Sequence, residues 1–159
     1  MKPRVYVETS VVSYLTARPS RDVVIAARQV TTREWWEAAP TGFELVISEL
    51  VREEASAGDP DAAQARLAAI ASLPLLRTPT SVTKLAQRLV SAGALPERAA
   101  QDAVHVATAA VHRAPFLVTW NLRHIANAVL RPQIEAVCRQ SGNEPPTLCT
   151  PDQLVMEVR

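Results

Sequence analysis

Residues 4–10 read RVYVETS and begin a pattern that the rest of the chain repeats. Residues 4–8 form a run of β-branched and aromatic side chains, which predicts a strand. Thr9 and Ser10 follow at once and are good N-cap residues for a helix over VVSYL. The chain therefore opens with a strand that passes directly into a helix.

Strands and helices alternate from there to the end of the sequence. The remaining strands are predicted at residues 43–48, 73–78, 116–120 and 148–150. The remaining helices are predicted at residues 23–38, 49–57, 61–72, 82–92, 96–112, 131–140 and 151–158. Strands joined through helices pair in parallel by right-handed crossovers, so we expect an α/β fold whose central, mostly parallel sheet is covered on both faces. No repeat or long linker divides the chain, so residues 1–159 are expected to form one domain.

The composition is that of a globular protein, with 48% hydrophobic and 21% charged residues. The formal net charge is only +1, so a nucleic-acid-binding surface would have to be local. Cys138 and Cys149 lack the spacing of a zinc site, which predicts reduced thiols. Because the sequence shows no apolar leader and no apolar run of membrane-spanning length, we expect a soluble, cytoplasmic protein that does not contact a membrane.

Two oxygen-bearing side chains follow directly on predicted strands. Glu8 ends the first strand, and Asn121 follows the strand at residues 116–120. In a parallel sheet the carboxyl ends of the strands share one edge, where ligands bind, so both side chains are expected in one crevice. The structural alternatives are a carboxylate favoured by the helix dipole for Glu8 and a turn or cap residue for Asn121.

Two further carboxylates lie on predicted helices. Glu54 has Leu50 and Val51 one turn before it, so the helix carries it inward, whereas Glu53 lies over Glu49 on the solvent side. The structural alternative for Glu54 is a rim residue whose stem alone is buried.

Asp102 lies in a largely apolar helix, with Val106 and Ala109 on its face, and a carboxylate in such a surface needs a partner. The alternative to a functional site is a pair with His105, three residues later. For His105 itself we expect packing or support of the site rather than direct ligation.

Carboxylate and amide oxygens suit Mg²⁺ or Mn²⁺, with water and substrate phosphate completing the coordination. Such ions support phosphodiester chemistry. The sequence contains no glycine-rich phosphate loop, no histidine cluster for zinc and no serine nucleophile elbow. These absences leave an oxygen-ligated metal site as the best interpretation.

In the order VYVETS, VISELVREE, the D-A-x-H-x-A segment at residues 102–107, and LVTWN, the sequence resembles the PIN domain family, and in particular the VapC-type toxins of type II toxin–antitoxin pairs. The resemblance runs along nearly the whole chain. It implies a single PIN-like α/β/α sandwich that binds Mg²⁺ or Mn²⁺ and hydrolyses RNA. It also implies an antitoxin protein as partner and a homodimer.

Carried over residue by residue, the resemblance assigns the catalytic set, the supporting set and the metal ligands. The catalytic set is Glu8, Glu54, Asp102 and Asn121; the supporting set is Thr9, His105 and His124; the metal ligands are Glu8, Asp102 and Asn121. Glu8 stands where the family has aspartate, and Asn121 stands where it has an acid. Fewer negative charges predict weaker binding of a hard cation, or a preference for Mn²⁺.

Three function classes are weighed. The first is a metal-dependent endoribonuclease acting as a toxin; the second is a PIN-like module that binds RNA or protein with weakened or lost nuclease activity. The third is a Mg²⁺ phosphohydrolase acting on DNA or small phosphates. For Arg18, Arg21 and Arg33 three alternatives stay open: substrate contacts, antitoxin contacts and solvated surface. Core packing rather than base stacking is expected of Trp35, Trp36 and Trp120.

Overall fold

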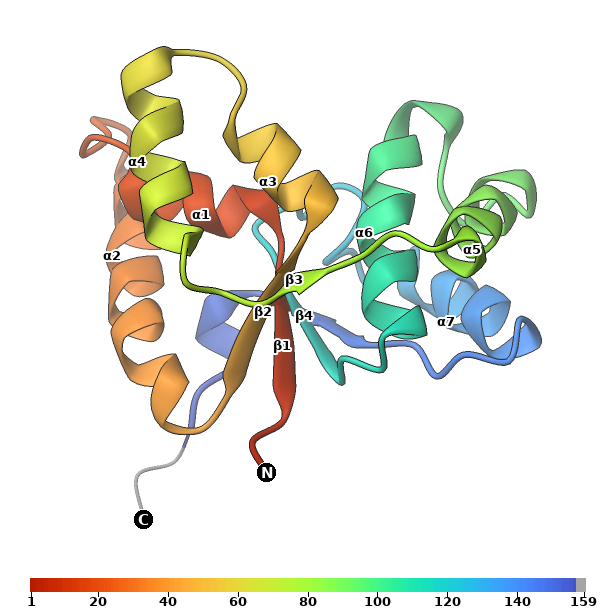
Figure 1. The fold of residues 1–159 in the computed structure, drawn as a ribbon. Coiled ribbons are helices and arrows are strands. Elements are labelled where there is room, and N and C mark those ends of the chain that lie inside the picture. The colour runs from red at the N-terminus through yellow and green to blue at the C-terminus, as the bar shows by residue number, and fades with distance from the viewer. Residues whose placement is uncertain (157–159) are drawn as a thin grey trace.

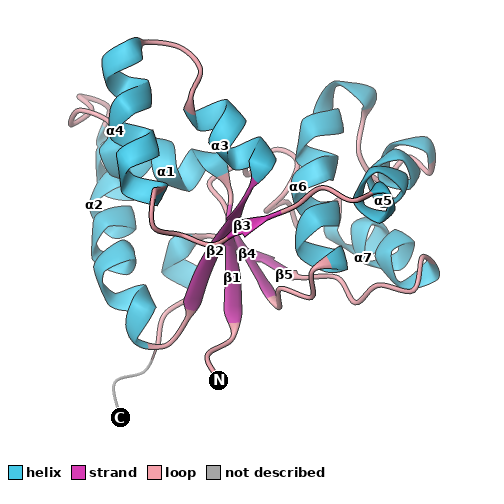
Figure 2. Cartoon of the chain, viewed as in Figure 1, coloured by secondary structure: helices cyan, strands magenta, loops and turns pink. Residues whose placement is uncertain are grey.

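A central sheet of five parallel strands organises the chain, and the computed structural model describes residues 1–156. The strands are β1 (Arg4–Val7), β2 (Glu44–Ser48), β3 (Leu75–Leu76), β4 (Phe116–Val118) and β5 (Thr147–Cys149). They lie in the order β3-β2-β1-β4-β5, with Tyr6 aligned with Val46 on one side and with Leu117 on the other (Figure 2). The strand order reverses between β1 and β4, which makes the carboxyl ends of these two strands the expected ligand crevice.

Helices cover both faces of the sheet (Figure 1). One group is α1 (Thr9–Thr16), α2 (Val23–Ala38), α3 (Glu49–Ala55) and α4 (Pro60–Ile70); the other is α5 (Thr80–Ser91), α6 (Ala100–Val111) and α7 (Arg131–Gln140). Right-handed crossovers on either side of β1 place the two groups on opposite faces. The expected α/β/α sandwich with a parallel sheet is confirmed.

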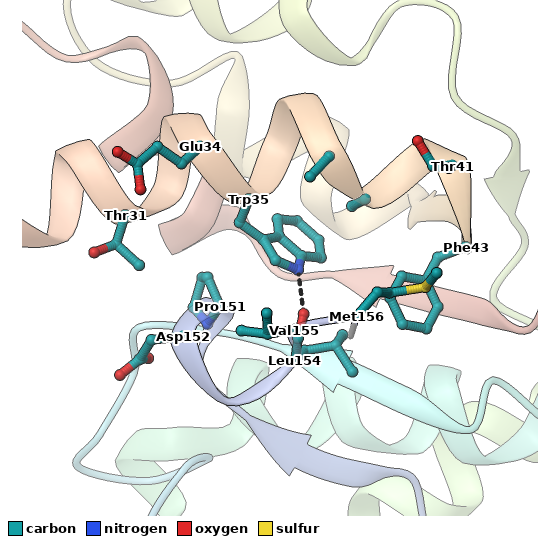
Figure 3. A pocket seen from close by; sticks show the side chains of 12 residues that line it. Thr31, Glu34, Trp35, Thr41, Phe43, Pro151, Asp152, Leu154, Val155 and Met156 are labelled. Atoms are coloured by element: carbon teal, nitrogen blue, oxygen red, sulfur yellow. Dashed lines mark hydrogen bonds between the residues drawn. The ribbon is translucent and has the colours of Figure 1, made fainter. Parts of the chain in front are cut away.

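The core lies between the sheet and the helices and includes the three tryptophans. The Trp35 indole N–H donates to the Leu154 carbonyl oxygen at 2.9 Å, which fastens the C-terminal segment to α2 (Figure 3). The Trp120 indole N–H donates to the Thr32 hydroxyl at 2.8 Å, and Trp36 is partly buried against the core. The expectation of core packing for these residues is confirmed.

Two local predictions were wrong. Residues 151–158 were predicted as a helix, but only a 3₁₀ turn, Pro151–Gln153, forms there, and 157–158 lie outside the described residues. The side chains of Thr150 and Gln153 close that turn as a capping box. The N-cap of α1 is Glu8 rather than Thr9 or Ser10, because the first strand ends at Val7 and the Glu8 carboxylate reaches the Ser10 N–H.

Cys138 and Cys149 are free and buried. Burial raises the pKa of each thiol to about 11, so both stay protonated at neutral pH. Within the described residues, no helix combines the length and apolar character needed to span a bilayer.

Candidate functional site

Glu8 sits at the carboxyl end of β1, beside the end of β4. Its carboxylate is only 5% exposed and has a donor on each oxygen. The Ser10 N–H donates to Oε2 at 2.5 Å, and the Thr119 hydroxyl donates to Oε1 at 2.7 Å. Glu8 therefore caps α1, near the positive end of the helix dipole, and ties the first turn of that helix to β4.

Glu54 lies where α1, α3 and α6 meet. Its Oε1 accepts a hydrogen bond from the Thr9 hydroxyl at 2.6 Å and lies 2.7 Å from His105 Nε2. Helix α3 carries Glu54 inward, whereas Glu49 and Glu53 are exposed. Thr9, which the resemblance placed in the supporting set, thus contacts Glu54.

His105 is almost completely buried, with 1% of its side chain exposed. Its Nδ1 lies 2.6 Å from the Tyr6 hydroxyl, so both ring nitrogens are occupied. The alternative interpretation of a pair between Asp102 and His105 is therefore wrong. The His105 side chain contacts Glu54 of α3 and not Asp102 of its own helix.

Asp102 instead meets His124 from the loop after β4. Asp102 Oδ2 lies 3.0 Å from His124 Nδ1. The backbone N–H of His124 donates to the Asn121 side-chain oxygen at 3.0 Å, and the Asn121 carbonyl accepts from the N–H groups of Ile125 and Ala126. The structure thus gives Asn121 the geometry of a turn-capping residue, and the turn it caps presents His124 to Asp102.

Several polar residues of this edge were missed by the sequence reasoning. Thr119 donates to Glu8 and accepts from the Asn121 N–H at 2.9 Å, and the Ser10 hydroxyl accepts from the Trp120 N–H at 2.8 Å. Thr119 lies inside the segment LVTWN, so its place beside Asn121 was the available signal. The sequence contains no such signal for Tyr6, because an aromatic residue in a strand is typical of a hydrophobic core.

The carboxylates do not form a closed metal cage. Among residues 1–156, no three His, Cys, Asp or Glu side chains are grouped closely enough to hold a metal ion. Within the same range, Glu54 Oε2 and Asp102 Oδ1 make no hydrogen bond, which leaves one free oxygen on each of these carboxylates. The predicted ligand set of Glu8, Asp102 and Asn121 stays a prediction.

Burial alone would raise the pKa of Glu54, but its partners reverse the shift. The hydrogen bond from His105 lowers the pKa, as does the charge on that ring whenever it is protonated, and the hydroxyl of Thr9 adds to the effect. The net direction is below the ordinary value of 4.5. Glu54 is therefore a carboxylate throughout the neutral range.

Glu54→Gln is expected to weaken the pH dependence of stability in acid. A lowered folded-state pKa means that the contribution of Glu54 is complete above its unfolded pKa and is lost as the pH falls through the folded value. Urea unfolding from neutral to acid pH should show the largest difference between wild type and variant at neutral pH. The exposed Glu53→Gln is the matched control, and a difference that does not shrink in acid would contradict the assignment.

Two cavities of similar volume open along α2. One, of about 590 Å³, is apolar and lies between α2 and the C-terminal segment, with Trp35 and Phe43 in its wall (Figure 3). The other, of about 560 Å³, is lined by Trp120 and by two basic residues, Arg28 and Arg131. Arg28 also lies 5.3 Å from the centre of the Trp120 ring. The second cavity continues from the edge of the sheet that carries Asn121.

Arg18, Arg21 and Arg33, the arginines considered above as substrate or antitoxin contacts, do not line either cavity. Arg18 and Arg21 are exposed and Arg33 is half-buried on α2. The sequence reasoning missed Arg28 and Arg131, which no motif distinguished from other arginines.

No protein-family model matches the sequence, and the comparison with curated proteins gives no match. Among solved structures, the chain is similar to a chain of VapBC2 from Rickettsia felis, solved bound to a DNA fragment from its promoter. The identity is 15%, the TM-score is 0.54, and the match covers 76% of this chain and 89% of the other. At this identity the likeness concerns the fold alone. The chain therefore has the PIN-like α/β/α fold that its sequence predicted.

Proposed function

We propose that this protein is a divalent-metal-dependent endoribonuclease and the toxin of a toxin–antitoxin pair. The observation that carries the proposal is the contact between Glu54 of α3 and His105 of α6. His105 follows Asp102 by three residues on α6, so Glu54 contacts the face of the helix that holds Asp102. Side chains three apart on a helix are neighbours, about 5–6 Å between Cβ atoms. Two carboxylates from two helices thus lie along one edge of the sheet.

The donor set fits Mg²⁺ or Mn²⁺ as cofactor. Mg²⁺ in phosphoryl-transfer sites takes one or two carboxylates and completes its shell with water and substrate phosphate. Glu54 and Asp102, each with a free oxygen, would hold the ion, which would supply water activation and neutralisation of charge on the phosphate. A cage of three protein ligands is not required for that role.

The other residues of the site hold these two carboxylates in place. Thr9 and His105 hold Glu54 through Oε1, and His124 holds Asp102 through Oδ2. Each carboxylate then has one orientation and one oxygen left for a ligand. In this proposal Glu8 fastens α1 to β4 through Thr119, and Asn121 shapes the turn that carries His124.

An antitoxin protein is the proposed partner, with RNA as the substrate. The likeness to a chain of a VapBC2 complex supports a toxin–antitoxin pair, although it concerns the fold. The sequence segments that resemble VapC-type toxins support the same conclusion. The cavity beside Trp120 supports a polyanionic substrate, because two arginines, Arg28 and Arg131, line it against one acid, Asp152.

The second candidate is a PIN-like module that binds RNA or protein without cleaving it. Glu8 favours this candidate, because both of its oxygens already accept hydrogen bonds from the protein. So does the lack of a three-residue metal cluster within residues 1–156. The two candidates differ in one measurable property, which is hydrolysis of RNA.

The proposal is tested with the purified chain and a structured RNA carrying single-stranded loops. Cleavage that requires added Mg²⁺ or Mn²⁺ and stops with a chelator is the expected result, and induced expression should arrest growth. Binding of the RNA without cleavage, under every metal condition, would favour the second candidate. A chain that neither binds nor cleaves the RNA would contradict both candidates and overturn the proposal.

Asn121→Asp is expected to raise the affinity for Mn²⁺ about tenfold, because it adds a negative charge in the turn that presents His124 to Asp102. A carboxylate near a partly screened cation contributes a binding free energy on the order of 1.4 kcal/mol. That energy corresponds to about a tenfold change in affinity. Calorimetric titration measures this affinity. The control is Asn127→Asp, which adds the same charge elsewhere in the same loop. Equal affinities for wild type and Asn121→Asp would show that this position does not contribute a ligand.

A further inference from the structure

A line of hydrogen bonds runs from the start of α3, through the sheet, to Glu54. The Ser48 hydroxyl lies 2.7 Å from the Tyr6 hydroxyl, which lies 2.6 Å from His105 Nδ1. His105 Nε2 then lies 2.7 Å from Glu54 Oε1. Ser48 and Tyr6 are completely buried, so these contacts exclude water. We call these four residues the Tyr6 relay.

The donors in the relay can be assigned from the groups at its two ends. Glu54 is a carboxylate and only accepts, so His105 Nε2 carries a proton and donates to it. At the other end, Ser48 accepts from the Val51 N–H at 3.2 Å, which leaves its own hydroxyl proton for Tyr6. Tyr6 can then donate only to His105 Nδ1. Every group is satisfied when His105 is neutral with its proton on Nε2.

The reverse arrangement leaves a buried donor without an acceptor. If His105 donated from Nδ1, Tyr6 would have to donate to Ser48, and the Ser48 proton would have no acceptor among residues 1–156. An unsatisfied buried donor costs about 1–3 kcal/mol. Burial raises the pKa of Tyr6, so the phenol keeps its proton in either arrangement. The cost of the unsatisfied Ser48 donor is what favours the first arrangement.

We infer that Tyr6 is a positioning residue that holds His105, as its Nε2–H tautomer, in orientation toward Glu54 and thereby holds Glu54 in place. The catalytic consequence rests on the proposed function, whereas the positioning of the ring does not. A histidine that donates to a carboxylate orients it most firmly when its other ring nitrogen is held as well. Tyr6 holds that nitrogen from the strand at the centre of the sheet.

Tyr6→Phe removes the donor to Nδ1 and leaves the ring volume nearly unchanged. Glu54 still keeps the proton of His105 on Nε2, but the ring is then held at one nitrogen instead of two and orients Glu54 less firmly. Loss of a partner that orients a ligand typically lowers metal affinity or activity by about 10–100-fold. We expect a loss in that range for Mn²⁺ affinity and for the rate of RNA cleavage.

The experiment is two-bond ¹H–¹⁵N NMR of the full chain labelled on histidine nitrogens, at neutral pH and without added metal. The three histidines, His105, His112 and His124, are assigned by single substitution. Wild type is expected to show the neutral Nε2–H pattern for His105, and Tyr6→Phe the same tautomer with an Nδ1 signal shifted by the loss of its hydrogen bond. The control is Tyr14→Phe, whose hydroxyl makes no hydrogen bond within the described residues.

Two results would overturn the inference. The first is a wild-type His105 that is protonated on Nδ1 or on both nitrogens, which needs no variant to detect. The second is a folded Tyr6→Phe whose His105 signals and Mn²⁺ affinity equal those of wild type. A chain that shows the expected tautomer but cleaves no RNA would uphold the relay and contradict the nuclease proposal, so the two failures are distinguishable.

Discussion

Asp102→Asn is expected to lower the rate of RNA cleavage by about 100-fold or more while the fold is kept. The asparagine oxygen can still accept the hydrogen bond from His124, so the change removes mainly the negative charge. Metal-assisted charge stabilisation contributes several kcal/mol to such reactions, and each 1.36 kcal/mol is a factor of ten in rate. Single-turnover cleavage of a labelled RNA with saturating Mn²⁺ measures the effect.

Asp61→Asn is the matched control for this variant. Asp61 stands in the first turn of α4, as Asp102 stands in the first turn of α6, so both variants remove one carboxylate from the positive end of a helix. Asp61 is exposed and lies outside the candidate site. Cleavage should be unchanged in Asp61→Asn. Equal rates for wild type and Asp102→Asn would remove Asp102 from the catalytic set.

The second large effect concerns stability, where Leu117→Ala is expected to lower the free energy of unfolding by about 2–5 kcal/mol. Leu117 is completely buried in β4, aligned between Tyr6 of β1 and Leu148 of β5. Both faces of a parallel sheet are covered by helices, so a cavity at this position cannot be filled by water or by an edge movement. Urea unfolding monitored by circular dichroism measures the loss.

Leu122→Ala makes the same chemical change at a side chain that is 41% exposed. Its effect should stay within about 0.5 kcal/mol, as for most surface substitutions. If Leu117→Ala cost no more than Leu122→Ala, β4 would not be the buried strand between β1 and β5 described above. The comparison therefore tests the burial of β4 independently of any enzymatic assay.

Much of the fold could be predicted from the sequence because patterns within short segments identify most of its strands and helices. Apolar runs of strand length alternated with helical periodicity, and punctuation by glycine and proline separated them. The inward position of Glu54 followed from Leu50 and Val51 one turn before it. The predicted terminal helix was wrong, because a capping box between Thr150 and Gln153 closes a single turn and residues 154–156 do not continue it.

The partners of the site residues could not be predicted in this way. Glu54 and His105 are 51 residues apart in the sequence, and their contact depends on how α3 and α6 pack across the end of the sheet. Asp102 had a histidine at helical spacing, yet it pairs with His124 from a loop. Spacing along one helix shows which side chains share a face, but it does not show what that face meets.

By itself, the sequence determined the alternating strands and helices, the parallel sheet and the edge at which Glu8 and Asn121 lie, because these depend on local propensity and on the periods of strand and helix. Tertiary structure alone decided which carboxylate oxygens accept hydrogen bonds. Both oxygens of Glu8 accept them, one from the first turn of α1 and one from Thr119. Within residues 1–156, Glu54 and Asp102 each keep one oxygen without a hydrogen bond. Hydrogen bonds between distant segments form only when packing brings donor and acceptor within about 3 Å, and no local pattern encodes that distance.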